Sequence, residues 1–135
     1  MSKILIVHED EYMRLFIKRA LSNEKYIEFA EAVDGDEAIQ KYHSQNPDLV
    51  LISVEISGIS SSETIQTILN IDPNATVVLL TTKNHNDRNI KLVIQAIKSG
   101  AKDYLTVPTL TKYQFPSNCS RDEQRIVEMV KKYLG

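Results

Sequence analysis

Polar residues able to bind a metal or take part in group transfer come directly after three apolar runs of the sequence. They are His8, Glu9, Asp10, Ser53, Glu55, Thr81 and Thr82. Imidazole and carboxylate groups together suit zinc or manganese, so the residues around His8 are one candidate metal site, with a solvated polar rim as the alternative. A serine hydroxyl is a poor nucleophile unless a base lies beside it, and His8 is the one base in prospect for Ser53. Both ideas require these residues to meet in the folded chain.

Residues 49–52 are four consecutive apolar residues, with Asn46-Pro47 before them and a serine- and glycine-rich stretch after them. Such a run is typical of a short strand that is buried on both faces, in the middle of a parallel sheet. Sheets of this kind carry their sites at the carboxyl ends of the strands. Ser53 and Glu55 are therefore predicted to lie at a functional edge.

Apolar runs and helical periodicity alternate along the chain. We predict strands at 3–7, 26–31, 48–53, 76–80 and 103–106, and helices at about 11–22, 37–43, 60–70, 88–98 and 121–134. Ser60 and Glu63 have the spacing of a capping box at the start of a helix. In the helix at 88–98 the apolar stripe consists of Ile90, Val93, Ile94 and Ile97. Strands joined by right-handed helical crossovers predict an α/β fold, a doubly wound five-stranded parallel sheet with helices on both faces.

The composition is that of an ordinary globular domain. The chain has 135 residues, enough for one domain (1–135) and too few for two. Its 16 basic and 18 acidic residues give a net charge of −2, which argues against a nucleic-acid-binding protein. No apolar run approaches the roughly 18 residues that a membrane span needs. The single cysteine, Cys119, excludes an internal disulfide and fits a reducing cytoplasm.

Several motifs occur in an order and spacing that resemble a response-regulator receiver domain of two-component signalling. These are residues 3–7 followed by acidic residues and Arg14, Asp34-Gly35 with Glu37-Ala38, residues 47–51, Gly58, Thr81, the block 99–105, and Pro108. The resemblance covers residues 3–108 and resumes in the final helix. It implies a flavodoxin-like sheet with the strand order 2-1-3-4-5, and a signalling module rather than an enzyme.

The resemblance also places a phosphoacceptor pocket on the residues singled out above, with altered residue types. A working receiver is expected to hold an acidic pair for Mg²⁺ after the first strand, an acceptor aspartate after the third, a hydroxyl after the fourth, and a lysine before the proline. The corresponding residues here are His8 with Glu9, Ser53, Thr81, and Val107 before Pro108. A shift of one residue would instead make Glu9 and Asp10 the acidic pair, but it would misplace Arg14.

These replacements predict a receiver that is not phosphorylated by the usual route. Ser53 cannot form an acyl phosphate, and Val107 removes the ammonium that would pair with the phosphoryl group. Mg²⁺ prefers carboxylates and waters, of which Glu9 and Glu55 are the remaining weak candidates, so no cofactor is expected and Mg²⁺ binding should be weak or absent. The alternatives are a working phosphoacceptor that uses Asp10 or Glu55, and a metal- or small-molecule-binding module on the same fold.

The expected output is docking to other proteins, such as a histidine kinase or an output protein, or to a second copy through the face formed by 88–98, 103–106 and 121–134. Four residues belong to this switch and partner face: Tyr104, Lys83, Tyr113 and Phe115. Tyr104 aligns with the aromatic residue that moves in receivers, or is a fixed ring at the edge of the core. Lys83 is a substitute cation or an exposed loop lysine. The long loop 109–120 offers its aromatic residues to a partner or folds them over the core.

Overall fold

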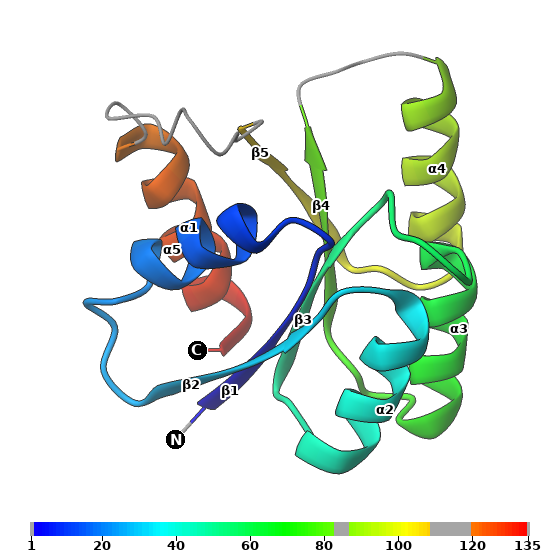
Figure 1. Ribbon diagram of the computed structural model, residues 1–135, viewed down its shortest axis with the longest axis horizontal. Helices are drawn as coiled ribbons and strands as arrows, with labels where there is room; N and C mark the ends of the chain where they lie inside the picture. The colour runs from blue at the N-terminus through cyan, green and yellow to red at the C-terminus, as the bar shows by residue number, and fades with distance from the viewer. Residues whose placement is uncertain (1, 83–86, 109–119, 135) are drawn as a thin grey trace.

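The computed structural model describes residues 2–82, 87–108 and 120–134, and in these ranges five strands alternate with five helices (Figure 1). The elements in chain order are β1 (Ser2–Val7), α1 (Glu11–Ala20), β2 (Ile27–Ala32), α2 (Gly35–Gln45), β3 (Leu49–Ser53), α3 (Ser61–Ile71), β4 (Val77–Thr82), α4 (Asp87–Lys98), β5 (Asp103–Val107) and α5 (Ser120–Leu134). None of the described helices is both long and apolar enough to cross a membrane.

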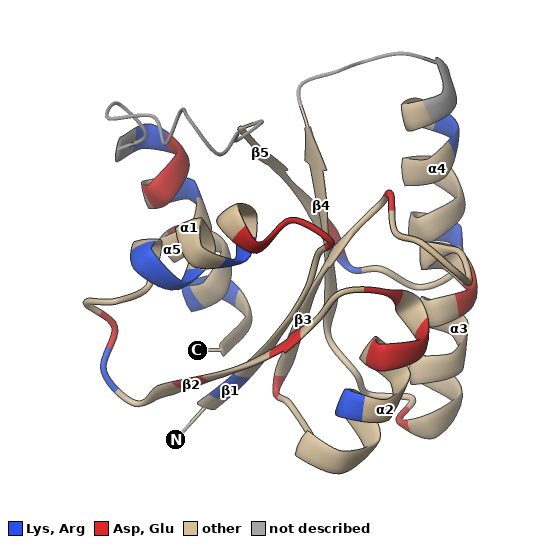
Figure 2. Cartoon of the chain, in the orientation of Figure 1, with Lys and Arg blue, Asp and Glu red and all other residues tan. Residues whose placement is uncertain are grey.

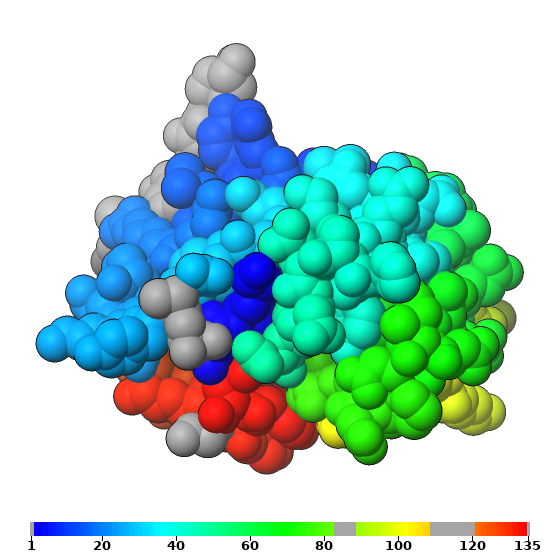
Figure 3. All heavy atoms as spheres, turned by 90° about the horizontal axis from the view of Figure 1, so that it is seen from below, coloured from blue at the N-terminus to red at the C-terminus, as the bar shows by residue number. Residues whose placement is uncertain are grey.

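All four pairs of neighbouring strands are parallel, in the order β2-β1-β3-β4-β5. Helices α1 and α5 lie together on one face of the sheet, and α2, α3 and α4 cover the other face (Figure 1). The predicted doubly wound fold and its strand order are therefore confirmed. The end of α5, in red, meets the start of β1, in dark blue, in the view from below (Figure 3).

The side chains of the central strands feed two separate cores because neighbouring residues of a strand point to opposite faces. Ile4 and Leu51 pack on the side of α1 and α5, whereas Leu5 and Val50 pack on the side of the other three helices. Every residue of β3 is buried, which agrees with the strand predicted from its apolar run. The predicted core residues of α5 include Ile126, which is almost fully buried.

Short polar side chains fix the starts of α2 and α3. The side chain of Ser60 accepts a hydrogen bond from the Glu63 amide, as its spacing predicted. Asp34 accepts from the Glu37 amide in the same way, and α2 therefore begins at Gly35, two residues earlier than predicted. The Asp-Gly pair looks like a turn in the sequence, but the aspartate is a helix cap.

The predicted apolar stripe of α4 is only partly core-facing, and this prediction was wrong for three of its four residues. Val93 packs against the core together with Leu92 and the fully buried Ala96. The other three residues are exposed by 40–48%: Ile90, Ile94 and Ile97. Helix α4 carries apolar residues on two sides, so periodicity alone does not decide which side meets the sheet. The exposed side is available to a partner.

The close approach of α2 to α3 depends on Gly35. An added Cβ at this position would lie 2.4 Å from the Thr64 hydroxyl and 2.6 Å from Ile59 Cγ1. Helix propensity alone would make Gly35→Ala stabilising, but overlap with these buried neighbours should cost about 2 kcal/mol net. Urea denaturation checks this, with Gln40→Ala on the exposed side of α2 as the control, expected within about 0.5 kcal/mol of the parent. A stabilised Gly35→Ala variant would contradict the packing.

Candidate functional site

The carboxyl ends of four strands meet at one edge of the sheet. Val7 of β1 pairs with Ile52 of β3. His8 follows Val7, and Ser53 follows Ile52 as the last residue of β3. Ser53 in turn pairs with Leu80 of β4. A cavity of about 570 Å³ lies over this edge. Its lining includes the predicted pocket residues His8, Glu9, Asp10, Ser53, Glu55, Thr81, Thr82 and Val107.

The Ser53 hydroxyl forms hydrogen bonds with the backbone of its own loop. The side chain is 7% exposed, donates to the Glu55 carbonyl over 3.1 Å and accepts from the Glu55 amide over 3.3 Å. A hydroxyl has one proton to donate, and here that proton goes to the backbone. His8 is therefore not needed as a partner for this hydroxyl, and the arrangement is that of a structural turn rather than an activated nucleophile.

Val107, predicted to stand at the family's lysine position, belongs to the core. It is 1% exposed and packs in the same cluster as Leu80, Leu105 and Ile126. An apolar side chain there offers no charge and no hydrogen bond to the cavity that it lines. Pro108 follows it and is not among the residues that line the cavity.

His8 and Asp10 are used to shape the turn between β1 and α1. The His8 Nδ1 accepts a hydrogen bond from the Asp10 amide over 3.0 Å, which requires this nitrogen to be unprotonated. The Asp10 carboxylate accepts from the Tyr12 amide and caps α1. Burial lowers the pKa of His8 below its ordinary value of 6.5, although the nearby Asp10 carboxylate acts in the opposite direction. His8 is thus held neutral.

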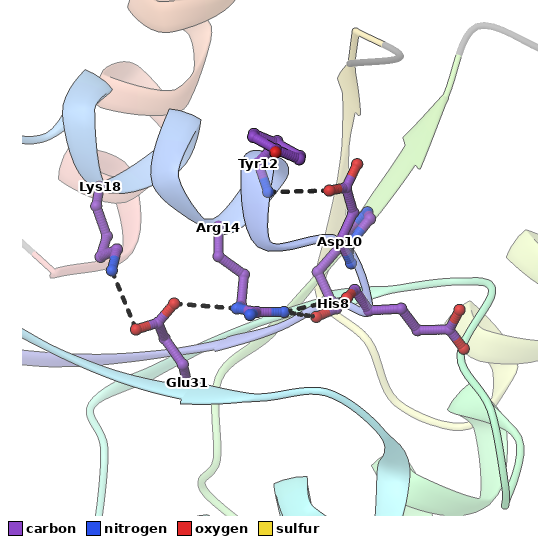
Figure 4. Close-up of polar contacts among 7 residues, drawn as sticks. His8, Asp10, Tyr12, Arg14, Lys18 and Glu31 are labelled. Carbon is purple, nitrogen blue, oxygen red and sulfur yellow. Dashed lines mark hydrogen bonds and ion pairs between the residues drawn. The ribbon is translucent and has the colours of Figure 1, made fainter. Parts of the chain in front are cut away.

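Arg14 of α1 extends between the same turn and Glu31 (Figure 4). Its Nη1 donates to the His8 carbonyl over 2.6 Å and to the Glu9 carbonyl over 3.3 Å. Its Nε donates to Glu31 on β2, which also pairs with Lys18 over 3.0 Å. Burial raises the pKa of Glu31, but the hydrogen bonds from Lys18 and Arg14 outweigh it and the net shift is downward. Arg14 is one of the residues on which the family resemblance rests, but its contacts with the turn and with Glu31 are seen only in the structure.

Glu9 is paired with Ser57, a contact that the sequence analysis missed. The Ser57 hydroxyl donates to the Glu9 carboxylate across the mouth of the cavity. The two residues are 48 positions apart, and no sequence pattern joins them. The carboxylate that was expected to remain for Mg²⁺ therefore already has a partner.

The cavity is acidic. Three carboxylates line it, from Glu9, Asp10 and Glu55, and no lysine or arginine lines it among the residues described. Acidic residues also mark the turn after β1, the loop after β3 and the start of α2 (Figure 2). Within the described ranges, no three histidine, cysteine or acidic side chains gather closely enough to hold a metal ion. Of the three carboxylates, Glu9 accepts a hydrogen bond from Ser57 and Asp10 accepts one from the Tyr12 amide.

The remaining predicted residues are placed only in part. The Thr81 hydroxyl is 3.4 Å from the Thr82 carbonyl, and Thr81 also lines a groove of about 190 Å³ beneath Tyr104. Tyr104 itself is 54% exposed, so its ring lies outward. The predicted Lys83, Tyr113 and Phe115 lie outside the described residues.

The neutral state of His8 makes stability depend on pH. The unfolded chain takes up a proton on His8 at a higher pH than the folded chain does. The free energy of unfolding is therefore highest above about pH 6.5 and falls as the pH drops, by at most about 1.4 kcal/mol per pH unit. Urea titrations at about pH 7.5 and about pH 5.5 should show a smaller loss for His8→Gln than for the parent. The exposed His43→Gln on α2 is the control and should keep the parent's loss. Equal pH dependence in His8→Gln and the parent would contradict this account.

Comparison with known proteins agrees with the fold. Residues 4–112 match the response regulator receiver domain family. The chain is 32% identical to the chemotaxis protein CheY of Thermotoga maritima over 106 residues, 78% of this chain and 85% of CheY. It is 29% identical to protein CcdB of Bacillus subtilis over 135 residues, 100% of this chain and 99% of CcdB. The receiver domain of NtrX from Brucella abortus has the same fold, with a TM-score of 0.76, 22% identity and 97% coverage of both chains. The protein belongs to the response-regulator receiver family of two-component signalling.

Proposed function

We propose that this receiver is not phosphorylated by the usual route of its family and that it acts by docking to other signalling proteins. The observation that carries this proposal is the chemistry of the strand ends, where Ser53 and Val107 stand in place of an acceptor carboxylate and a lysine. We further propose that it works as a stand-alone receiver in the cytoplasm; its relative CcdB has nearly the same length as this chain.

Phosphoryl transfer to a receiver needs a nucleophile and positive charge to stabilise the transferring oxygens. The described lining of the cavity offers three carboxylates and a neutral imidazole. A phosphoryl donor would meet like charge at close range and no described compensating cation, so both its binding and the transition state are disfavoured. We also propose that Mg²⁺ binding is weak or absent, for a different reason: His8 and Ser53 supply no carboxylate at two positions where the family is expected to have one.

The alternative acceptors are less well suited. Asp10 is occupied as the cap of α1, and its removal from that role would cost about 1 kcal/mol. Glu55 is exposed on the loop after β3. Neither carboxylate has a described lysine or arginine among the other residues that line the cavity. We therefore place no phosphoryl group on either.

The docking surface that we propose is the exposed side of α4 together with β5. Ile90, Ile94 and Ile97 lie on this side, and Tyr104 of β5 borders the same groove as the first two. Exposed aliphatic and aromatic side chains at adjoining positions are the composition of an interface core. The partner is a histidine kinase, an output protein or a second copy of this chain.

Incubation with acetyl phosphate and Mg²⁺, followed by mass spectrometry of the intact protein, tests the phosphorylation proposal. We expect no gain in mass and no rise in melting temperature with millimolar Mg²⁺. The matched control restores the family's residues with His8→Asp, Ser53→Asp and Val107→Lys together, and should gain one phosphoryl group. A stoichiometric gain in the parent that is lost in mild base would overturn the proposal in favour of Asp10 or Glu55.

Sedimentation of the purified protein tests the docking surface with a second copy as partner. Ile94→Glu places a charge at the centre of the exposed apolar side of α4 and should weaken self-association about tenfold or more, equivalent to about 1.4 kcal/mol. Ile71→Glu on α3 is the control, because Ile71 is similarly exposed at 45%. Equal weakening by both variants would assign the self-association to general surface charge rather than to this side of α4.

A further inference from the structure

One residue, Ser57, joins three loops at the carboxyl edge of the sheet. Its backbone forms a parallel bridge with Asp34, the residue that caps α2. Its hydroxyl donates to the carboxylate of Glu9, in the turn after β1. Ser57 itself lies in the loop after β3. The loops that follow β1, β2 and β3 are thus connected through a single side chain and its backbone.

Both sides of this connection are held in place by other contacts. Arg14 donates to the Glu9 carbonyl and fixes the turn after β1 against β2. On the other side, Gly58 has a φ of +77°, and a Cβ added there would lie 3.2 Å from the Asp36 carboxylate. The backbone after Ser57 therefore turns tightly against the start of α2. A hydrogen bond between two fixed loops loses little side-chain entropy, so it can be retained even though Ser57 is exposed.

We propose that the Glu9–Ser57 hydrogen bond, rather than a bound divalent cation, holds the loops after β1 and β3 together and orders the rim of the cavity. This inference is independent of whether Ser53 is phosphorylated, because it concerns the loops in the unmodified protein.

Hydrogen exchange of the intact protein tests this connection. In Ser57→Ala, amide exchange in residues 8–11 and in residues 54–60 should both rise about threefold to tenfold, the lower range for losing a hydrogen bond to a charged group at an exposed position. Ser57→Thr keeps a hydroxyl and should exchange like the parent. Ser62→Ala, a hydroxyl removed one helical turn away in α3, is the control and should leave both segments unchanged. Unchanged exchange in Ser57→Ala, or a rise in residues 54–60 alone, would refute the connection.

Acetyl phosphate treatment of the parent decides the phosphorylation proposal separately, so the two proposals can fail independently.

Discussion

Burial of β3 on both faces is the constraint on which the site depends. Every residue of Leu49–Ser53 is buried, and each leucine or isoleucine contributes about 1.5–3 kcal/mol through the apolar surface that it removes from water. A strand flanked by β1 and β4 and covered by helices on both sides cannot shift its register without exposing that surface. Ser53 is therefore fixed at the middle of the carboxyl edge, where its hydroxyl must find hydrogen-bond partners and does so in the Glu55 backbone.

The replacements at this edge form a consistent set in physical terms. An acceptor carboxylate and a nearby lysine stabilise one another, and removal of one partner from a buried pair leaves an unpaired charge at a cost of about 3–5 kcal/mol. A chain that has Ser53 in place of the carboxylate is therefore better served by Val107, which is 1% exposed and packs into the core, than by a lysine. His8 fits the same pattern, because a buried imidazole that is neutral needs no counter-ion. Among the described residues that line the cavity, Ser53, Val107 and the neutral His8 carry no charge, and the acidic residues are Glu9, Asp10 and Glu55.

Much of the fold could be predicted from the sequence because it depends on residues close together in the chain. Apolar runs gave all five strands, and the spacing of Ser60 and Glu63 gave the cap of α3. The start of α2 was missed because an aspartate before a glycine serves equally as a turn or as a helix cap. The exposed stripe of α4 was misjudged since the helix is apolar on two sides, and only the docking of Leu92 and Ala96 against the sheet decides between them.

The residues of the site were predictable in type and place, but their contacts were not. The strand ends identified His8, Ser53 and Val107, because parallel strands bring their carboxyl ends together. The partners of Glu9 and Arg14 lie 48 and 17 positions away in the chain, and neither pair belongs to a local pattern. Such contacts arise from how loops cross the edge of the sheet. These contacts decide whether a carboxylate at the edge already accepts a hydrogen bond from another loop.

Thr81 connects the inert cavity to the surface that we propose for docking. It lines the cavity at the strand ends and also the small groove bordered by Ile90, Ile94 and Tyr104. A ligand shifts a protein between two states only by as much as it binds one better than the other. In the proposed function no phosphoryl group or metal binds beside Thr81, so the cavity would exert no such difference on the α4 side. Such a receiver would transmit its abundance, or the state of its partner, rather than a change in its own charge.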